Sequence, residues 1–129
     1  MTKVIVVGHA GYGTAMKRNI NMLVGEVDFI FVDFNEQDDL DNLRGKLQAA
    51  LKEAKDCDVL FACDLSGGSP FREAAVICSE NPGFAVVAGL NTSAYTDMAF
   101  SLDLSPMELA QQAAEVARST VLIYPPEEG

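Results

Sequence analysis

Short apolar runs alternate with longer amphipathic segments along most of this chain. Residues 3–8 (KVIVVG) form a continuous apolar run that is rich in β-branched side chains and closes on a glycine. A run of this kind is typical of a strand that is buried on both faces. Residues 36–55 instead place leucines and alanines on one helical face and charged side chains on the other, which predicts a surface helix.

The same alternation continues to the C-terminal region. Strands are predicted at 3–8, 27–34, 57–65 and 83–90, and helices at 13–24, 36–55, 69–80, 93–102 and 106–118. Strands that alternate with helices pack as a parallel sheet between helical layers. The sequence therefore predicts an α/β fold, a three-layer αβα sandwich around a mainly parallel four-stranded sheet, in one domain spanning residues 1–129.

Several boundaries carry their own signals. Ser105 and Glu108 have the spacing of a capping box at the start of the last helix. Ser69, which a proline follows, is expected to be the N-cap of the third helix. Residues 119–126 (STVLIYPP) form a late apolar run that two prolines stop. We expect this run to be an edge strand that pairs antiparallel in the same sheet or with another subunit.

Charge and composition exclude several classes of function. The chain has 9 Lys and Arg against 19 Asp and Glu, a formal net charge of −10, which disfavours nucleic acid and anionic membranes as partners. No run approaches the roughly 20 apolar residues that span a bilayer, and no signal peptide is visible, so a cytoplasmic protein is expected. Cys57, Cys63 and Cys78 lack CxxC spacing and are predicted to be free thiols. With a single histidine, no metal site and no cofactor are expected.

The candidate reactive group is that histidine, His9. It directly follows the first strand, at the carboxyl edge of the sheet where ligands bind in folds of this class. Neutral imidazole is a nucleophile when one ring nitrogen is free and an acceptor holds the proton on the other. Asp64, after the third strand, supplies that acceptor if strands one and three adjoin, and Asp33 is the alternative. The alternative is that His9 is an ordinary packed or surface histidine and that Asp64 is an ordinary loop carboxylate.

Residues 64–71 (DLSGGSPF) form the sharper motif. Gly67 and Gly68 allow the backbone to approach an anion closely, and the N–H groups that open the following helix point at the same edge. A phosphoryl group on His9 could rest on these amides and on the hydroxyls of Ser66 or Ser69. The alternative is a glycine turn that simply leads into a helix.

Three further features each allow two interpretations. Arg72 either contacts a phosphate or is solvated. Tyr12 and Tyr95 are interpreted as packing residues, with a place on the rim of the site as the alternative. Residues 8–15 (GHAGYGTA) fit the dinucleotide pattern GxGxxG only loosely, because the third glycine is missing, although Asp33 ends the second strand as that pattern requires.

With these motifs in hand, the chain resembles a mannose-type IIA component of the bacterial sugar phosphotransferase system, and within that family the N-acetylgalactosamine/galactosamine-like branch. The resemblance rests on GHAGYGTAMKRNINMLVGE, VDF, CDLSGGSPFREAA and VVAGLN, and it covers essentially the whole chain. It departs from the family pattern at Ala10, where a glycine is usual, at Arg72, where asparagine is usual, and at residues 91–95.

The resemblance implies a phosphohistidine carrier and phosphotransferase component. His9 matches the phosphorylated histidine, Asp64 the aspartate that orients it, and Ser69 the serine of the Gly-Gly-Ser-Pro block. Phosphate would arrive from HPr and pass to a IIB component for sugar uptake, with membrane IIC and IID components as indirect partners. The family also implies a homodimer with an exchanged C-terminal strand, for which residues 119–124 are the candidate.

Other functions on the same architecture remain open from the residues alone. One is the phosphotransfer subunit of a dihydroxyacetone kinase system, which shares the fold and a similar histidine motif. Others are a nucleotide- or flavin-binding module, although no lysine lies near the glycine loop, and a purely regulatory domain.

Overall fold

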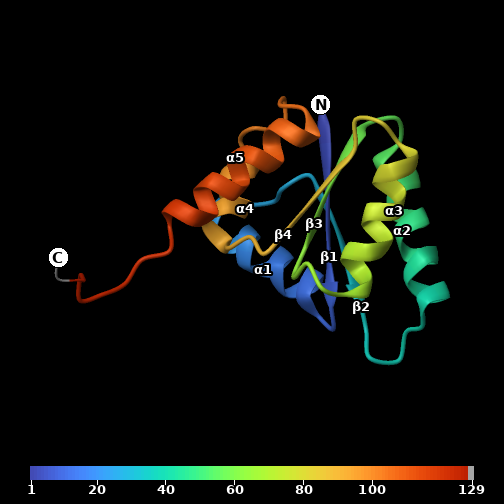
Figure 1. Cartoon of the computed structure of the whole chain (residues 1–129), viewed down its shortest axis with the longest axis horizontal. Helices are drawn as coiled ribbons and strands as arrows, with labels where there is room; N and C mark the ends of the chain where they lie inside the picture. Colours follow the sequence, from blue (N-terminus) through green and yellow to red (C-terminus); the bar gives the residue numbers. More distant parts are fainter. Residues whose placement is uncertain (128–129) are drawn as a thin grey trace.

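The computed structural model describes residues 1–127 and contains four strands and five helices in alternating order (Figure 1). The strands are β1 (Thr2–His9), β2 (Phe29–Phe34), β3 (Asp58–Cys63) and β4 (Ala85–Ala88). The helices are α1 (Tyr12–Val24), α2 (Leu40–Ala54), α3 (Ser69–Glu80), α4 (Thr92–Met98) and α5 (Pro106–Ser119).

The four strands form one parallel sheet in the order β2-β1-β3-β4. This confirms the predicted α/β class and the parallel four-stranded sheet. β1 lies between β2 and β3, with Val7 opposite Cys63 and His9 opposite Phe34. The carboxyl ends of β1, β2 and β3 therefore meet at one edge of the sheet, and Asp64 follows directly on the strand beside His9.

Helices cover both faces of the sheet, as Figure 1 shows: α2 and α3 lie on one face, and α1, α4 and α5 on the other. Alternate residues of β1 enter the two cores, because successive side chains of a strand point to opposite faces. Val4 and Val6 pack with the α1, α4 and α5 layer, whereas Ile5 and Val7 pack with the α2 and α3 layer. Continuing this alternation directs Gly8 toward α1 and His9 toward α3.

One helix of the C-terminal third is shorter than predicted, and the late strand is not formed within the described part of this single chain. The helix expected at 93–102 ends at Met98. The expected strand at 119–126 is absent from the described chain: α5 continues to Ser119, and residues 121–127 are exposed and outside any strand. A strand needs a hydrogen-bonding neighbour, and within residues 1–127 this segment has none. Its pairing with another subunit stays a prediction.

The capping box of α5 is confirmed: the Ser105 hydroxyl accepts from the Glu108 N–H at 3.3 Å, and the Glu108 carboxylate accepts from the Ser105 N–H at 3.1 Å.

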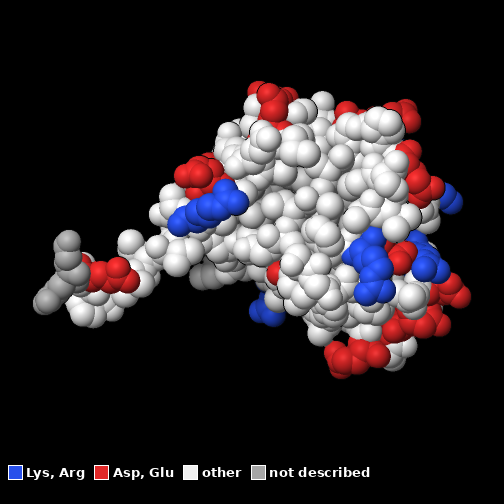
Figure 2. All heavy atoms as spheres, in the orientation of Figure 1, with Lys and Arg blue, Asp and Glu red and all other residues white. Residues whose placement is uncertain are grey.

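On the face in Figure 2 much of the surface is uncharged, and acidic side chains gather mainly near the lower right. Among residues 1–127, no helix is long and apolar enough to cross a membrane.

Candidate active site

His9 ends β1 at the carboxyl edge of the sheet, with its side chain 41% exposed. Its Nδ1 lies 2.8 Å from Asp64 Oδ2, and the same oxygen accepts the His9 backbone N–H at 2.9 Å. The other oxygen, Oδ1, accepts the Leu65 N–H at 3.0 Å. The Asp64 carboxylate therefore holds both the backbone and the ring of His9.

These contacts also determine which ring nitrogen carries the proton. Burial raises the pKa of Asp64, but the hydrogen bonds from the His9 backbone and ring, together with the Leu65 N–H, outweigh it and leave the pKa below its ordinary value. Asp64 is therefore ionised at neutral pH and can only accept. Nδ1 must then be the donor, and in the neutral ring Nε2 keeps its lone pair.

Gly68 lies against the Nε2 side of the imidazole. A Cβ at Gly68 would stand 2.5 Å from His9 Cε1 and 2.8 Å from Nε2, closer than any side chain allows. On β2, the Phe34 ring packs beside the histidine, with ring centroids 5.9 Å apart and planes inclined by 58°. The imidazole is thus held by a carboxylate, a glycine backbone and an aromatic ring, while part of the side chain stays exposed at the rim.

The segment that begins at Asp64 crosses this rim before α3 begins. Ser66 and Gly67 are exposed, and Gly68 and Ser69 are half-buried. The prediction that Ser69 caps α3 was wrong: Gly68 is the N-cap, without a side-chain cap, and Ser69 is the first helical residue. Because the Arg72 N–H is already bonded to the Gly68 carbonyl at 3.1 Å and Pro70 has no N–H, the Ser69 and Phe71 N–H groups are those left free in the first turn. They follow Gly68, whose backbone lies against the His9 ring.

The turn after His9 is held by β2. Ala10 has a φ of +53°, in the left-handed region that favours glycine, and its N–H donates to the Phe34 carbonyl at 2.6 Å. Asp33, the alternative partner for the imidazole, instead accepts the Thr14 N–H at 3.0 Å and the Thr14 hydroxyl. It thereby caps α1, whose own N-cap, Gly11, offers no side chain.

This role of Asp33 also bears on the dinucleotide interpretation. That fold uses the acidic residue after the second strand to bind a ribose hydroxyl. Here both carboxylate oxygens of Asp33 are engaged by Thr14. The geometry therefore gives the dinucleotide interpretation no support.

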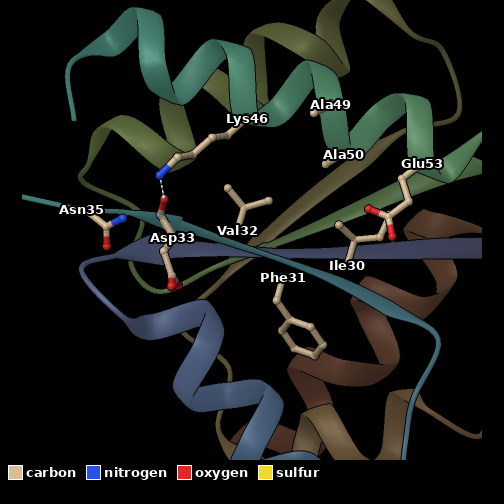
Figure 3. A pocket seen from close by; sticks show the side chains of 9 residues that line it. All are labelled: Ile30, Phe31, Val32, Asp33, Asn35, Lys46, Ala49, Ala50 and Glu53. Carbon is tan, nitrogen blue, oxygen red and sulfur yellow. Dashed lines mark hydrogen bonds between the residues drawn. The ribbon is translucent and has the colours of Figure 1, made fainter.

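A shallow pocket of about 390 Å³ lies at the open edge of β2 and not at His9 (Figure 3). It runs along Ile30, Val32 and α2, and Lys46 closes one end by donating to the Asp33 carbonyl at 2.8 Å and to Asp38 at 2.6 Å. The pocket and the histidine therefore both border β2, but His9 does not line the pocket.

The three cysteines are free thiols, as predicted. Cys63 is fully buried at the end of β3, and burial together with the adjacent Asp64 charge raises its pKa to about 12. It is therefore a packing residue beside the site and not a nucleophile. Across residues 1–127, no three His, Cys, Asp or Glu side chains gather as metal ligands.

Comparison with known proteins identifies the family to which this chain belongs. Residues 3–100 match the family model EIIA-man, described as the PTS system fructose IIA component. The chain belongs to the mannose-type EIIA family of the phosphotransferase system. It is 33% identical over 89 residues to the sorbose-specific EIIA component of Lacticaseibacillus casei, and 33% over 93 residues to the fructose-specific EIIA component of Bacillus subtilis. These alignments cover 68% and 70% of this chain, and 64% of each relative, so this EIIA chain matches just under two thirds of their length.

Solved structures agree with this assignment. The mannose/sorbose-specific IIA subunit from Enterococcus faecalis superposes with a TM-score of 0.89 at 31% identity, covering 98% of this EIIA chain and 97% of that one. The EIIA component from Streptococcus agalactiae superposes with a TM-score of 0.86 at 19% identity, which shows the same fold. The predicted family is thus confirmed.

Two features of the site were missed from the sequence. The first is Phe34 against the imidazole, which no pattern signals because an aromatic residue in a strand is ordinary. The second is a hydrogen bond of 2.6 Å between the hydroxyls of Tyr12 and Tyr95, on the α1 and α4 side of β1. Both tyrosines were interpreted as packing residues, and only the topology brings their hydroxyls together.

Proposed function

We propose that residues 1–129 are one phosphocarrier domain, in which His9 accepts a phosphoryl group from HPr and passes it to a IIB component for sugar uptake. The observation that carries the proposal is the geometry of His9. Its Nδ1 is bonded to an ionised Asp64 at 2.8 Å, which leaves Nε2, on the Gly68 side of the ring, as the nitrogen with the lone pair. Membership of the EIIA-man family supports a role of this histidine in sugar phosphotransfer.

The transfer uses Nε2 as the nucleophile. The Nε2 lone pair attacks phosphorus, the bond from phosphorus to the donor nitrogen breaks, and its electron pair stays on the donor ring. The Nδ1 proton remains on His9, where the Asp64 carboxylate stabilises the positive charge that develops on the imidazole. In the second step a nucleophile of the IIB component attacks the same phosphorus, and Nε2 leaves as neutral imidazole.

Ser66, Gly67, Gly68 and Ser69 are proposed to receive the phosphoryl oxygens. Backbone N–H groups at the start of a helix are directed at bound anions and interact favourably with their charge. The free amides ahead of Arg72 begin beside the ring that Gly68 touches. Arg72, exposed one turn further on, would face a docked partner or its phosphate.

The protein partners and assembly are part of the same proposal. Val121, Leu122 and Tyr124 are 73%, 89% and 90% exposed, and β4 lies at a free edge of the sheet. An exchange of this segment between two subunits would cover it and give a homodimer. Membrane IIC and IID components would act downstream of IIB, and the carrier itself would work in the cytoplasm.

The experiment is incubation with phosphoenolpyruvate, enzyme I and HPr, followed by intact-mass measurement. Wild type should gain the mass of one acid-labile phosphoryl group, and His9→Ala should gain none. Potassium phosphoramidate, a small donor that loses ammonia on transfer, provides a second arm that needs no partner protein. The proposal is refuted if wild type takes up no phosphoryl group from HPr and none from phosphoramidate.

A further inference from the structure

Two tyrosine hydroxyls meet on the face of β1 opposite to Asp64 and Gly68. Tyr12 Oη and Tyr95 Oη lie 2.6 Å apart, with Tyr95 fully buried and Tyr12 half-buried. Burial raises the pKa of both hydroxyls, so the pair stays neutral at physiological pH. Because a buried hydroxyl without a partner is costly, each hydroxyl keeps the other in place.

The ring of Tyr12 lies directly against Gly8, the residue before His9. A Cβ at Gly8 would stand 2.5 Å from Cδ1, 2.7 Å from Cγ and 2.8 Å from Cβ of Tyr12. No side chain fits between them, so the tyrosine side chain blocks any movement of the Gly8 backbone toward α1. Tyr12 thus supports the end of β1 that carries His9 from the α1 face of the sheet.

Tyr95 anchors this support to a well-fixed helix. Asn91 caps α4, with its Oδ1 accepting the Ala94 N–H at 3.0 Å, and the Tyr95 N–H donates to the Asn91 carbonyl at 3.2 Å. Ala94 and Met98 of the same helix are fully buried, as is Tyr95. The buried Tyr95 hydroxyl therefore holds the Tyr12 side chain in place through the hydrogen bond between the two hydroxyls.

We propose that Tyr95 is a positioning residue for phosphoryl transfer, acting through the Tyr12 hydroxyl to hold the backbone of Gly8 and thus the imidazole of His9. This inference rests on the phosphocarrier function proposed above. Asp64 and Gly68 orient the ring relative to β3 and α3, and Tyr12 supports β1 from the opposite face. In-line attack requires the reacting atoms to be aligned at about 3–3.5 Å, so a looser strand end slows the transfer.

The test compares Tyr95→Phe, Tyr12→Phe and the double variant with a matched control. Thr92→Val removes another hydrogen bond between the same two helices, from the Thr92 hydroxyl to Asn19 Oδ1 at 2.7 Å, and that bond does not reach Gly8. The rate of phosphoryl transfer from potassium phosphoramidate to His9 is measured for each variant, together with the thermal midpoint.

We expect each phenylalanine variant to transfer about 2- to 10-fold more slowly, as the loss of one neutral hydrogen bond allows. The double variant should be no slower than the slower single variant, because both substitutions break the same bond. Thr92→Val should keep the wild-type rate even if its thermal midpoint falls as far as those of the phenylalanine variants. Amide hydrogen exchange at His9 should rise in Tyr95→Phe and not in Thr92→Val.

A Tyr95→Phe rate equal to that of Thr92→Val overturns the inference while leaving the carrier function intact. Independent, multiplicative effects of the two phenylalanine substitutions also overturn it, since Tyr95 would then not act through Tyr12. A wild-type chain that takes up no phosphoryl group from either phosphoramidate or HPr refutes the carrier function itself, and this inference with it.

Discussion

A methyl group at Gly68 has no space beside His9, so Gly68→Ala should displace the imidazole. The added Cβ would stand 2.5 Å from Cε1, whereas ordinary contact begins at 3.4 Å. The ring must therefore retreat by about 0.9 Å, the difference between those distances. Moving away from α3 stretches the Nδ1 contact with Asp64, now 2.8 Å, beyond the range of a good hydrogen bond.

The size of the effect follows from the bond that is lost. A hydrogen bond to a charged group contributes about 1.5–3 kcal/mol, which corresponds to a transfer rate about 10- to 150-fold lower. Gly45→Ala in α2 is the control, because its Cβ would meet nothing within 4 Å and the residue lies outside the phosphate loop. The assay is the rate of phosphoryl uptake from phosphoramidate. Rates for Gly68→Ala and Gly45→Ala that agree within about twofold would show that the glycine contact does not hold the ring.

Three further predictions concern stability and reactivity. Ala10→Gly should raise the free energy of unfolding by about 0.5–1 kcal/mol, because Ala10 has a φ of +53°, which glycine adopts without strain. Ala15→Gly, at an exposed position in α1, should instead lower the free energy of unfolding by about 1 kcal/mol. Urea titrations measure both, and equal losses of stability in the two variants would contradict the account. The pKa of Asp64 is lowered from 3.8, so its ionised form stabilises the fold above that pH, and the contribution is lost as pH falls through the lower folded-state pKa. Wild type should therefore lose more stability on acidification than Asp64→Asn, and parallel pH profiles would argue against the hydrogen bonds to His9. With its pKa raised to about 12, the buried Cys63 thiol should react with iodoacetamide at neutral pH only on unfolding, after the half-exposed Cys57; peptide mapping that finds Cys63 modified first would refute this.

Much of the fold was predictable because β-branched runs and amphipathic helices have distinct periods. The order β2-β1-β3-β4 was not, since it depends on how the strands pair in space. That order brings both Asp33 and Asp64 to the end of β1, and the side-chain contacts distinguish them: Asp64 bonds to His9, whereas Asp33 is engaged by Thr14. Residues 119–126 have the composition of a strand, but composition does not supply a neighbour, and within residues 1–127 the segment has none.

The glycine loop shows how a motif can be located correctly and interpreted incompletely. Gly68 was predicted to let a phosphate approach the backbone, and the structure shows that it also admits the His9 ring itself. Ser69 followed by proline has the pattern of a helix N-cap, yet the helix begins one residue earlier because the Arg72 N–H bonds to the Gly68 carbonyl. Alanine itself gives no sign of the left-handed turn at Ala10, because it rarely adopts that conformation; the glycine that is usual at this position in the family is the signal for it.

The most direct test of the carrier is nuclear magnetic resonance of the phosphorylated protein labelled with ¹⁵N-histidine. His9 is the single histidine of the chain, so the two ring nitrogens give the only signals. The geometry predicts that phosphorus couples to Nε2, while Nδ1 keeps its proton and its hydrogen bond to Asp64. Coupling to Nδ1, or a chain that takes up no phosphoryl group at His9, would contradict the account.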